Sequence, residues 1–371
     1  MTGNASSGRV SPNALNRRQL RLCCNALKVS CHGTVPELKG RIRRAKGKTQ
    51  LRSLNRDHLR LLARANNILC SRGLTRSQLV NRLCAKKIVS AIKLTMNEMF
   101  AGIGGAALGA TRAGIRVMAS VDSDPGACGT YAFNHGTSPF CVDVSSRWPD
   151  LPRADLLWAS PPCQPFARIG KQLGFLDPRG LLMMRIPSYL RKFKPLAAVL
   201  EQSPNVQNVN DGRDWQTWLT AANRAGYSVQ CFTLDAFDFQ LPQHRVRLFI
   251  VLWRKALRLK VDTPVPGPRR SLSAVLRKPC VKDVSRAIRA SGGGGAPEDS
   301  HDFTHHTLRD GGVYVANHSD MLKIQGFPAA FRFPRGLTAA SKQRMIGNAV
   351  PPAMAAAVLT NVRVAIANAE K

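Results

Sequence analysis

The sequence contains little negative charge. Its 371 residues include 22 Asp and Glu against 55 Lys and Arg, which gives a formal net charge of +33. A field of this sign and strength makes a polyanion the default partner, and nucleic acid is the first candidate. The sequence also lacks an uncharged apolar run close to the ~18 residues that cross a bilayer, and its start lacks a signal-peptide core. We therefore expect a monomer that is not secreted and has no membrane partner.

The ten cysteines lack regular spacing. This distribution indicates reduced thiols, in the nucleus if the source is eukaryotic and otherwise in the cytoplasm. Cys280 lies near His301, His305 and His306 in sequence, which raises the idea of a zinc site. One cysteine without a Cys-x-x-Cys pair instead favours solvated loop histidines, so we expect no metal.

The basic charge is concentrated in the first quarter of the chain. Residues 1–95 hold 21 Lys and Arg and only two acids, a net charge of +19. Within them, Leu-Asn-Arg followed by Leu-Arg-Leu occurs twice, starting at Leu15 and at Leu54. Each copy continues with a glycine and a second leucine-bearing stretch, which predicts two helix-turn-helix hairpins over about residues 14–45 and 53–86.

The two hairpins resemble the SAP module, a helical hairpin that binds the DNA backbone. Phosphate contact explains the excess of basic residues, because each neutralised phosphate releases counterions. Two other interpretations stay open. The charges can form a merely solvated face, or the Arg-rich start can belong to an organellar transit peptide.

A different kind of sequence begins at Asn97. A short apolar stretch precedes the glycine-rich run 101–105, a small-residue segment follows, and a second apolar stretch ends at Asp122. This order predicts strand, glycine turn, helix and strand, the βαβ unit that binds nucleotide-type cofactors through the turn and through an acid on the ribose. An ordinary tight turn fits the same residues.

The run Ser160-Pro161-Pro162-Cys163-Gln164-Pro165 follows another apolar stretch. Its prolines prevent a helix and stiffen the loop, and the end of a parallel strand is where ligands bind in open α/β sheets. Cys163 is therefore a candidate nucleophile, as thiolate. The alternative for a lone cysteine is a buried apolar filler.

From about residue 97 to 366 the chain resembles the cytosine-C5 DNA methyltransferases. The resemblance rests on ordered motifs: the turn Phe100-Ala101-Gly102-Ile103-Gly104-Gly105, Asp122 with Ser123, Asp143 with Val144, Pro162-Cys163-Gln164, the loop from Gly170 to Leu182, Glu201, Gln243-His244-Arg245-Val246-Arg247, Gln325-Gly326-Phe327-Pro328, and Asn348-Ala349-Val350. It implies an α/β fold, a Rossmann-like methyltransferase sheet that binds S-adenosyl-L-methionine (SAM), with double-stranded DNA as substrate.

The resemblance also assigns roles. It gives SAM binding to Phe100 through Gly105, Asp122, Ser123, Asp143, Val144, Pro162, Leu182, Asn348, Ala349 and Val350. Cys163 attacks C6 of a flipped cytosine, Glu201 donates a proton towards N3, and Arg245 and Arg247 orient both and polarise O2. Burial at a strand end is expected to favour the protonated form of Glu201. For the two arginines, surface charge on a strand is the alternative.

The motifs divide the chain into four expected parts. They are residues 1–95 for DNA docking, 96–254 for SAM binding and catalysis, 255–316 as a small, irregular target-recognition region, and 317–371 returning to the catalytic domain. Gln202-Ser203 departs from the family's Glu-Asn-Val pattern, from which we expect slower or altered catalysis. Two other functions remain possible: the same chemistry on tRNA, or a decayed enzyme that only binds DNA.

Overall fold

The fold is built on a seven-stranded sheet with the strand order β3-β2-β1-β4-β5-β8-β6. Its strands are β1 (Thr95–Met99), β2 (Arg116–Asp122), β3 (Phe140–Cys141), β4 (Leu156–Ala159), β5 (Ala197–Gln202), β6 (Tyr227–Asp235) and β8 (Val246–Arg254). Strands β1 to β5 pair in parallel, and β8 runs antiparallel between β5 and β6. The predicted α/β sheet is confirmed. Since β1, β2, β4 and β5 are parallel, the loops that follow them meet at one edge.

The computed structural model describes residues 93–168, 171–292 and 303–369. The predicted basic hairpins at 14–45 and 53–86 lie outside the described residues, and so does His301.

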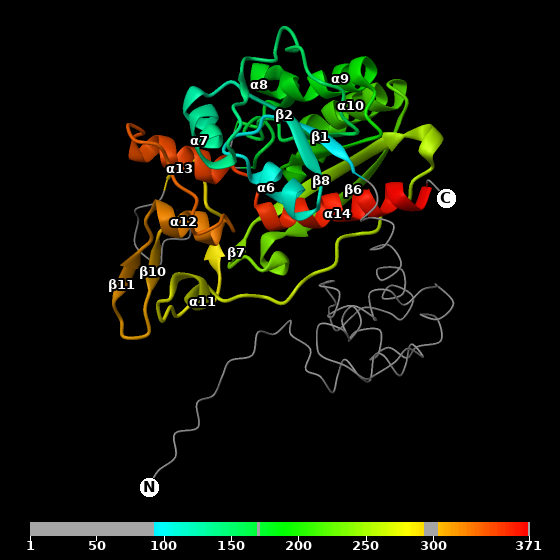
Figure 1. The fold of residues 1–371 in the computed structure, drawn as a ribbon. Coiled ribbons are helices and arrows are strands. Elements are labelled where there is room, and N and C mark those ends of the chain that lie inside the picture. The colour runs from blue at the N-terminus through cyan, green and yellow to red at the C-terminus, as the bar shows by residue number, and fades with distance from the viewer. Residues whose placement is uncertain (1–92, 169–170, 293–302, 370–371) are drawn as a thin grey trace, which may run out of the picture. The chain divides into compact units, whose positions relative to one another are not determined.

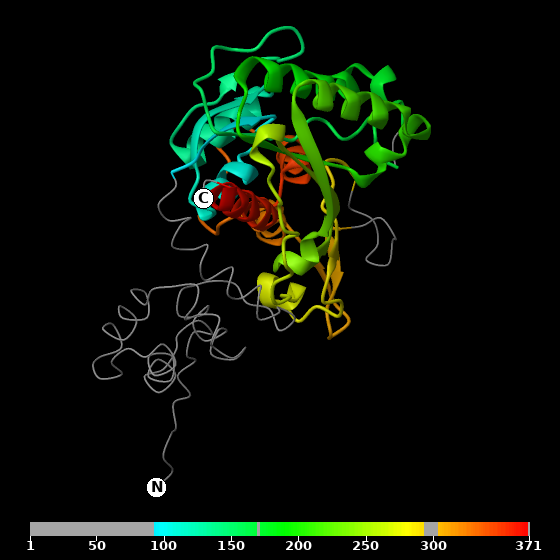
Figure 2. The same ribbon diagram turned by 90° about the vertical axis from the view of Figure 1, so that its right-hand side faces the viewer.

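Helices cover both faces of the sheet (Figures 1 and 2). One face carries α8 (Pro178–Leu181), α9 (Arg185–Phe193) and α10 (Arg213–Arg224), and the other carries α6 (Gly105–Arg112) and α14 (Pro352–Ala369), while α7 (Pro125–His135) connects β2 to β3. Helix α14 packs along α6 because Gly109 has no side chain, and a Cβ there would overlap Ala355. The last helix is thereby held beside the glycine turn at the start of α6.

Short elements fill the connections. They are the 3-10 turns η1 (Gly174–Leu176), η2 (Leu182–Met184), η3 (Pro204–Gln207), η4 (Val209–Gly212), η5 (Ala236–Phe239) and η6 (Lys255–Leu257), the helices α11 (Leu272–Leu276), α12 (His318–Ile324) and α13 (Ala339–Asn348), and the strands β7 (Gln243–His244), β9 (Ser285–Arg286), β10 (His305–Thr307) and β11 (Val313–Val315). Strand β7 pairs with β9, and β10 pairs with β11.

The segment after β8 shares a core with the helices that follow it. Leu272, Cys280 and Phe303 pack in one buried cluster with Met321 and Met345. The expected recognition region therefore packs on α12 and α13 as one body. Within the described residues, no group of three His, Cys, Asp or Glu side chains could hold a metal ion.

One expectation about hydropathy needs correction. Among the described residues, the stretch Ala339–Ala369 is long and apolar enough to cross a membrane by length and composition, because it contains an 18-residue window with a mean hydropathy of 1.4. It consists of two helices, α13 and α14, that are interrupted at residues 349–351. Because 67% of its most apolar window is buried inside the fold, the apolar residues of this stretch are those of a core helix.

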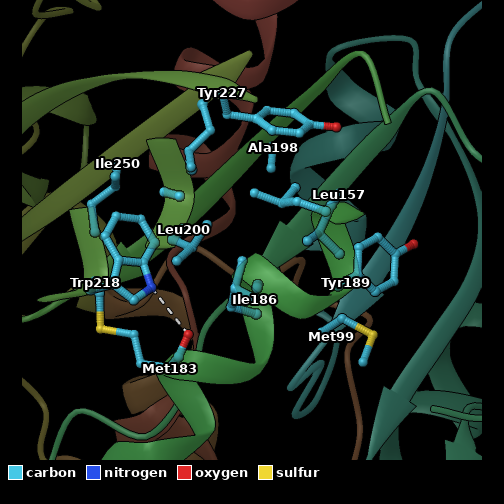
Figure 3. Close-up of a cluster of buried hydrophobic side chains, with 14 of the residues drawn as sticks. Met99, Leu157, Met183, Ile186, Tyr189, Ala198, Leu200, Trp218, Tyr227 and Ile250 are labelled. Atoms are coloured by element: carbon cyan, nitrogen blue, oxygen red, sulfur yellow. Dashed lines mark hydrogen bonds between the residues drawn. The ribbon is translucent and has the colours of Figure 1, made fainter. Parts of the chain in front are cut away.

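The largest buried cluster lies between the sheet and helices α9 and α10 (Figure 3). Trp215, Trp218 and Ala222 recur every three or four residues along α10, so they share the helix face that meets the sheet. Trp218 is fully buried, and its indole N–H donates to the carbonyl of Met183 over 3.1 Å. This contact ties α10 to η2.

We expect Trp218→Ala to lower the free energy of unfolding by about 3–5 kcal/mol, because it leaves a large cavity and an unpaired carbonyl. Urea denaturation measures the change. Gln216→Ala on the exposed side of the same helix is the control. Equal stability of the two variants would contradict this account of the core.

Candidate active site

The glycine turn after β1 contains three residues in the left-handed region of backbone conformation. Phe100, Gly102 and Gly104 all have positive φ angles, of 56°, 54° and 86°. The turn bends back onto β2, where the Gly102 N–H donates to the Asp122 carboxylate over 2.7 Å. A Cβ at Gly102 would meet no atom within 4 Å, so open space lies beside this backbone. Free space, a turn and a carboxylate together fit the ribose side of a nucleotide-type cofactor.

The C-terminal motif lies against this turn. The carbonyl of Val350 lies where a Cβ of Gly105 would be, so these two segments touch through backbone atoms. Asn348 is exposed, and its Oδ1 lies 3.5 Å from Nε2 of Gln164 in the cysteine loop. Asn348, Ala349 and Val350 therefore bridge the glycine turn and the cysteine loop.

The other predicted cofactor residues lie along the same edge. Burial raises the pKa of Asp122, whose neighbour Ser123 is exposed. Asp143 is exposed beside a cavity of about 450 Å³, and buried Val144 accepts a hydrogen bond from Arg185 through its carbonyl. Leu182 is half-buried in η2.

Cys163 lies in the loop after β4, partly exposed. Its carbonyl accepts hydrogen bonds from the N–H groups of Phe166 and Ala167, which closes the loop into a turn. Burial raises the pKa of the Cys163 thiol. The positive charges of Arg247 and Arg245 oppose this shift, and the negative charge of Glu201 adds to it. In the free protein a larger fraction of Cys163 is therefore protonated than of an ordinary cysteine at the same pH.

Glu201 and Arg247 form an ion pair beside this thiol. Glu201 is the penultimate residue of β5 and is buried, and its Oε1 lies 3.0 Å from Nε of Arg247 on β8. The pair is possible because β5 and β8 are neighbours, with Glu201 opposite Phe249, two residues from Arg247. The charges of all four predicted catalytic side chains act on one another in this region.

The fourth, Arg245, lies in different contacts from those expected. Its guanidinium is buried and donates to the carbonyls of Ile288, Gly347 and Ala349 over 3.0, 2.9 and 3.3 Å. Burial lowers its pKa to about 9, so the group remains charged at neutral pH. The hydrogen bonds of Arg245 therefore join the segment around Ile288 to the C-terminal motif. Arg245 acts on Glu201 and Cys163 through its charge, while its hydrogen bonds go to these backbone carbonyls.

Gln202 fills the position where the family pattern has Asn. Its side chain is fully buried; Nε2 donates to the carbonyl of Pro161 over 3.3 Å, and Oε1 accepts from the Ser203 N–H over 2.8 Å. The longer amide thus still braces the Pro-Pro-Cys loop from the adjacent strand.

Two further residues escaped the sequence analysis. Asn205 donates to the carbonyl of Phe166 over 2.8 Å and to Oε1 of Gln172 over 2.9 Å. Glu98, fully buried in β1, lies near the hydroxyls of Ser120 and Tyr131, and burial raises its pKa to about 8. An acid inside an apolar strand just before a glycine turn was the available signal for Glu98; Asn205 had none.

Comparison with known proteins matches the described site to one family. The model of the C-5 cytosine-specific DNA methylases matches residues 94–306 and 316–363. The chain belongs to this family. The matched residues include Cys163, the Glu201–Arg247 ion pair and the glycine turn, so the family resemblance found in the sequence is confirmed.

Relatives and solved structures agree with this membership. The chain is 37% identical over 180 residues to the type II methyltransferase M.HaeII of Haemophilus aegyptius and 38% over 181 residues to M.NlaX of Neisseria lactamica. These matches cover 48% of this chain and 56% and 57% of the relatives, so the chain spans just over half of their length. M.BsuFI of Bacillus subtilis is 28% identical over 336 residues, 83% of this chain and 82% of the relative.

The fold also matches solved structures. Entamoeba histolytica methyltransferase EhMeth has a TM-score of 0.57 at 14% identity, and a Spodoptera frugiperda DNMT2 variant has 0.55 at 18%. They cover 73% and 71% of this chain and 98% of each structure. At these identities the likeness shows a shared methyltransferase fold.

We expect Cys163 in the free methylase to react with iodoacetamide more slowly at pH 7.5 than the exposed Cys141, because its raised pKa leaves less thiolate. Arg247→Gln removes a cation that lowers this pKa and slows labelling further, whereas Glu201→Gln speeds it. Each change should be about 3- to 10-fold, since one pKa unit is tenfold in thiolate below the pKa. Peptide mass mapping against pH measures both thiols. Faster labelling of Arg247→Gln than of Glu201→Gln would reject the electrostatic assignment.

We expect Gln202→Leu to lower the methyl-transfer rate about 5- to 150-fold, because it leaves a buried carbonyl and N–H unpaired next to the cysteine loop. Gln202→Asn should not exceed the wild-type rate, since the present amide already reaches Pro161. Ser203→Ala is the control, because it keeps the N–H that Gln202 accepts. A gain of activity in Gln202→Asn would instead show that Gln202 is a defect.

Proposed function

We propose that this chain is a SAM-dependent methyltransferase that methylates C5 of cytosine in double-stranded DNA. The observation that carries the proposal is the Cys163 loop beside the Glu201–Arg247 ion pair, with the glycine turn and Asn348 at the same edge. A nucleophile next to a charged acid–base pair supports addition to an aromatic ring, and membership in the C-5 cytosine methylases supports the choice of base.

SAM fits the glycine turn by the chemistry of the residues present. Asp122 supplies a carboxylate for ribose hydroxyls, Gly102 leaves open space beside backbone N–H groups, and Asp143 stands exposed two residues beyond β3 for an adenine amine. When bound, SAM supplies an electrophilic methyl group. Phe100, Ala101, Ile103, Gly104, Gly105, Ser123, Val144, Pro162, Leu182, Asn348, Ala349 and Val350 complete the proposed binding set.

The protein's own residues carry the remaining steps. The Cys163 thiolate adds to C6 of a flipped cytosine, and the C5–C6 electron pair moves to C5, which takes the methyl carbon. The Glu201 carboxylate takes up a proton from solvent and passes it to N3, which stabilises the charge on the ring, and Arg247 holds that carboxyl and polarises O2. Loss of the C5 proton then expels the thiolate and restores the aromatic ring. Arg245 acts at a distance, by fixing the carbonyls of Gly347 and Ala349.

The strongly basic residues 1–95 fit DNA docking in this proposal. Their net charge of +19 would supply phosphate contacts that a small recognition region cannot. Such affinity is independent of sequence, so it would add binding strength without adding to the choice of target.

Tritiated methyl transfer from SAM tests the proposal. We expect label in duplex DNA, none in tRNA, and none in DNA with Cys163→Ser. Oligonucleotides that contain 5-fluorocytosine should form a covalent adduct at Cys163 in the presence of SAM, because fluorine cannot leave as a proton does. Bisulfite mapping of the product DNA then gives the target sequence.

Ser123→Ala, an exposed position of the proposed cofactor site, gives a matched variant with weaker SAM use but an intact nucleophile. Label confined to tRNA would change the substrate class. Folded protein that binds DNA but forms no adduct would support the decayed enzyme instead.

A further inference from the structure

The loop that follows Cys163 is fastened to the body of the fold at two places. Near its start, Asn205 on η3 donates to the carbonyl of Phe166 and to the side chain of Gln172. Further along, the carboxylate of Asp214 on α10 accepts the N–H of Phe175 over 2.7 Å. The exposed basic residue Lys171 lies on this loop, and Arg179, also exposed, follows it in α8, where it pairs with Asp177 at 2.6 Å.

The contact with Asp214 is closely fitted. Gly174 has a positive φ of 56°, and a Cβ at this position would overlap the Asp214 carboxylate. The Gly174 N–H donates to the carbonyl of Pro165 over 3.0 Å, two residues after Cys163. The ring of Phe175 packs edge-on against buried Phe166 at 6.0 Å between centroids. The turn Leu173–Phe175 is therefore held by Asp214 on one side and by the cysteine loop on the other.

The segment before α10 is strained in a way that serves this contact. Asn210, Asp211 and Gly212 are three successive residues in the left-handed region, with φ of 55°, 57° and 75°. Two of them carry side chains, and such a conformation persists only where surrounding contacts enforce it. Asn210 donates to the same oxygen of Asp214 over 2.9 Å and reaches the carbonyl of Leu173 at 3.5 Å. This backbone conformation thus places Asn210 so that its hydrogen bond to the Asp214 carboxylate holds that carboxylate against the loop.

A first-turn acid such as Asp214 also stabilises its own helix through the helix dipole. That role does not require a glycine without room for a Cβ, nor an N–H from a segment 39 residues away. Asp211 provides the contrast. It carries the same charge one turn earlier, is almost fully exposed, and contacts Arg213 at 3.2 Å.

We propose that Asp214 is a positioning residue that fixes the turn Leu173–Phe175, and thereby the far end of the loop that follows Cys163. A loop fixed at both ends has less conformational freedom to lose when it meets DNA. The contribution to DNA methylation rests on the proposed function, whereas the fixing of the loop does not.

Limited trypsin digestion of the full chain tests the fixing without any activity. Cleavage after Lys171 and Arg179 follows the population of the released loop. We expect it to be about tenfold faster in Asp214→Ala than in the wild type, the size of one hydrogen bond to a charged group. Asp211→Ala should cleave at the wild-type rate, and Asp214→Asn, which keeps one acceptor oxygen, should lie between.

Gly174→Ala disturbs the same contact from the loop side and keeps Asp214. It should reproduce the faster cleavage, and the double variant Gly174→Ala with Asp214→Ala should be no faster than the faster single variant, because both remove one interaction. Additive rates, or equal rates for Asp214→Ala and Asp211→Ala, would overturn the proposal.

Kinetics separate positioning from general damage. In Asp214→Ala we expect kcat/KM for duplex DNA to fall about tenfold while the Kd for SAM stays within about twofold, because the glycine turn does not contact this loop end. Equal loss of SAM binding would mean that Asp214 only maintains the fold. Faster cleavage together with an inactive wild type would support the fixed loop and reject the proposed function.

Discussion

The methylase depends on one constraint: the loops after its parallel strands must meet at one edge of the sheet. The glycine turn follows β1, Asp122 ends β2, the cysteine loop follows β4, and Glu201 lies near the end of β5. These groups are spread over residues 100–201 of the sequence but occupy neighbouring strands in the order β2-β1-β4-β5. The antiparallel strand β8 then places Arg247 against Glu201 from the other side. No single motif contains the site; the strand order assembles it.

Backbone carbonyls connect this edge to the rest of the molecule. The guanidinium of Arg245 donates to carbonyls of Ile288 and of the C-terminal end of α13. Buried Gln325 donates to two carbonyls at that same helix end, those of Ile346 and Ala349. A buried charge that lost these acceptors would be left unpaired, which is costly. The segment that bears Val350 is therefore held against Gly105 by contacts that originate in the recognition region.

Much of the edge could be predicted from the sequence because its chemistry is local. Glycines with positive φ, prolines around a cysteine and an acid at a strand end are readable from residue types and their spacing. Arg245 was placed in the right motif with the wrong contacts, since its partners lie 43 to 104 residues away and are main-chain atoms that carry no residue signature. Gln202 was interpreted as a weakness because the length of its amide matters only relative to Pro161. Asp214 gave no signal, because its partner is a backbone N–H.

The raised pKa of Cys163 means that the contacts of the free protein favour the protonated thiol. The thiol faces two cations and one anion, yet burial outweighs them, so the free protein keeps its nucleophile mostly protonated. A thiolate is oxidised and alkylated more readily than a thiol, so the protonated form protects the nucleophile until substrate binds. The groups that favour ionisation are already in place, and Arg247 divides its charge between the thiol and Glu201. A base that engages Glu201 would release part of that charge to the sulfur, so the same ion pair that holds the carboxyl in the free protein would couple nucleophile activation to occupancy of the base site.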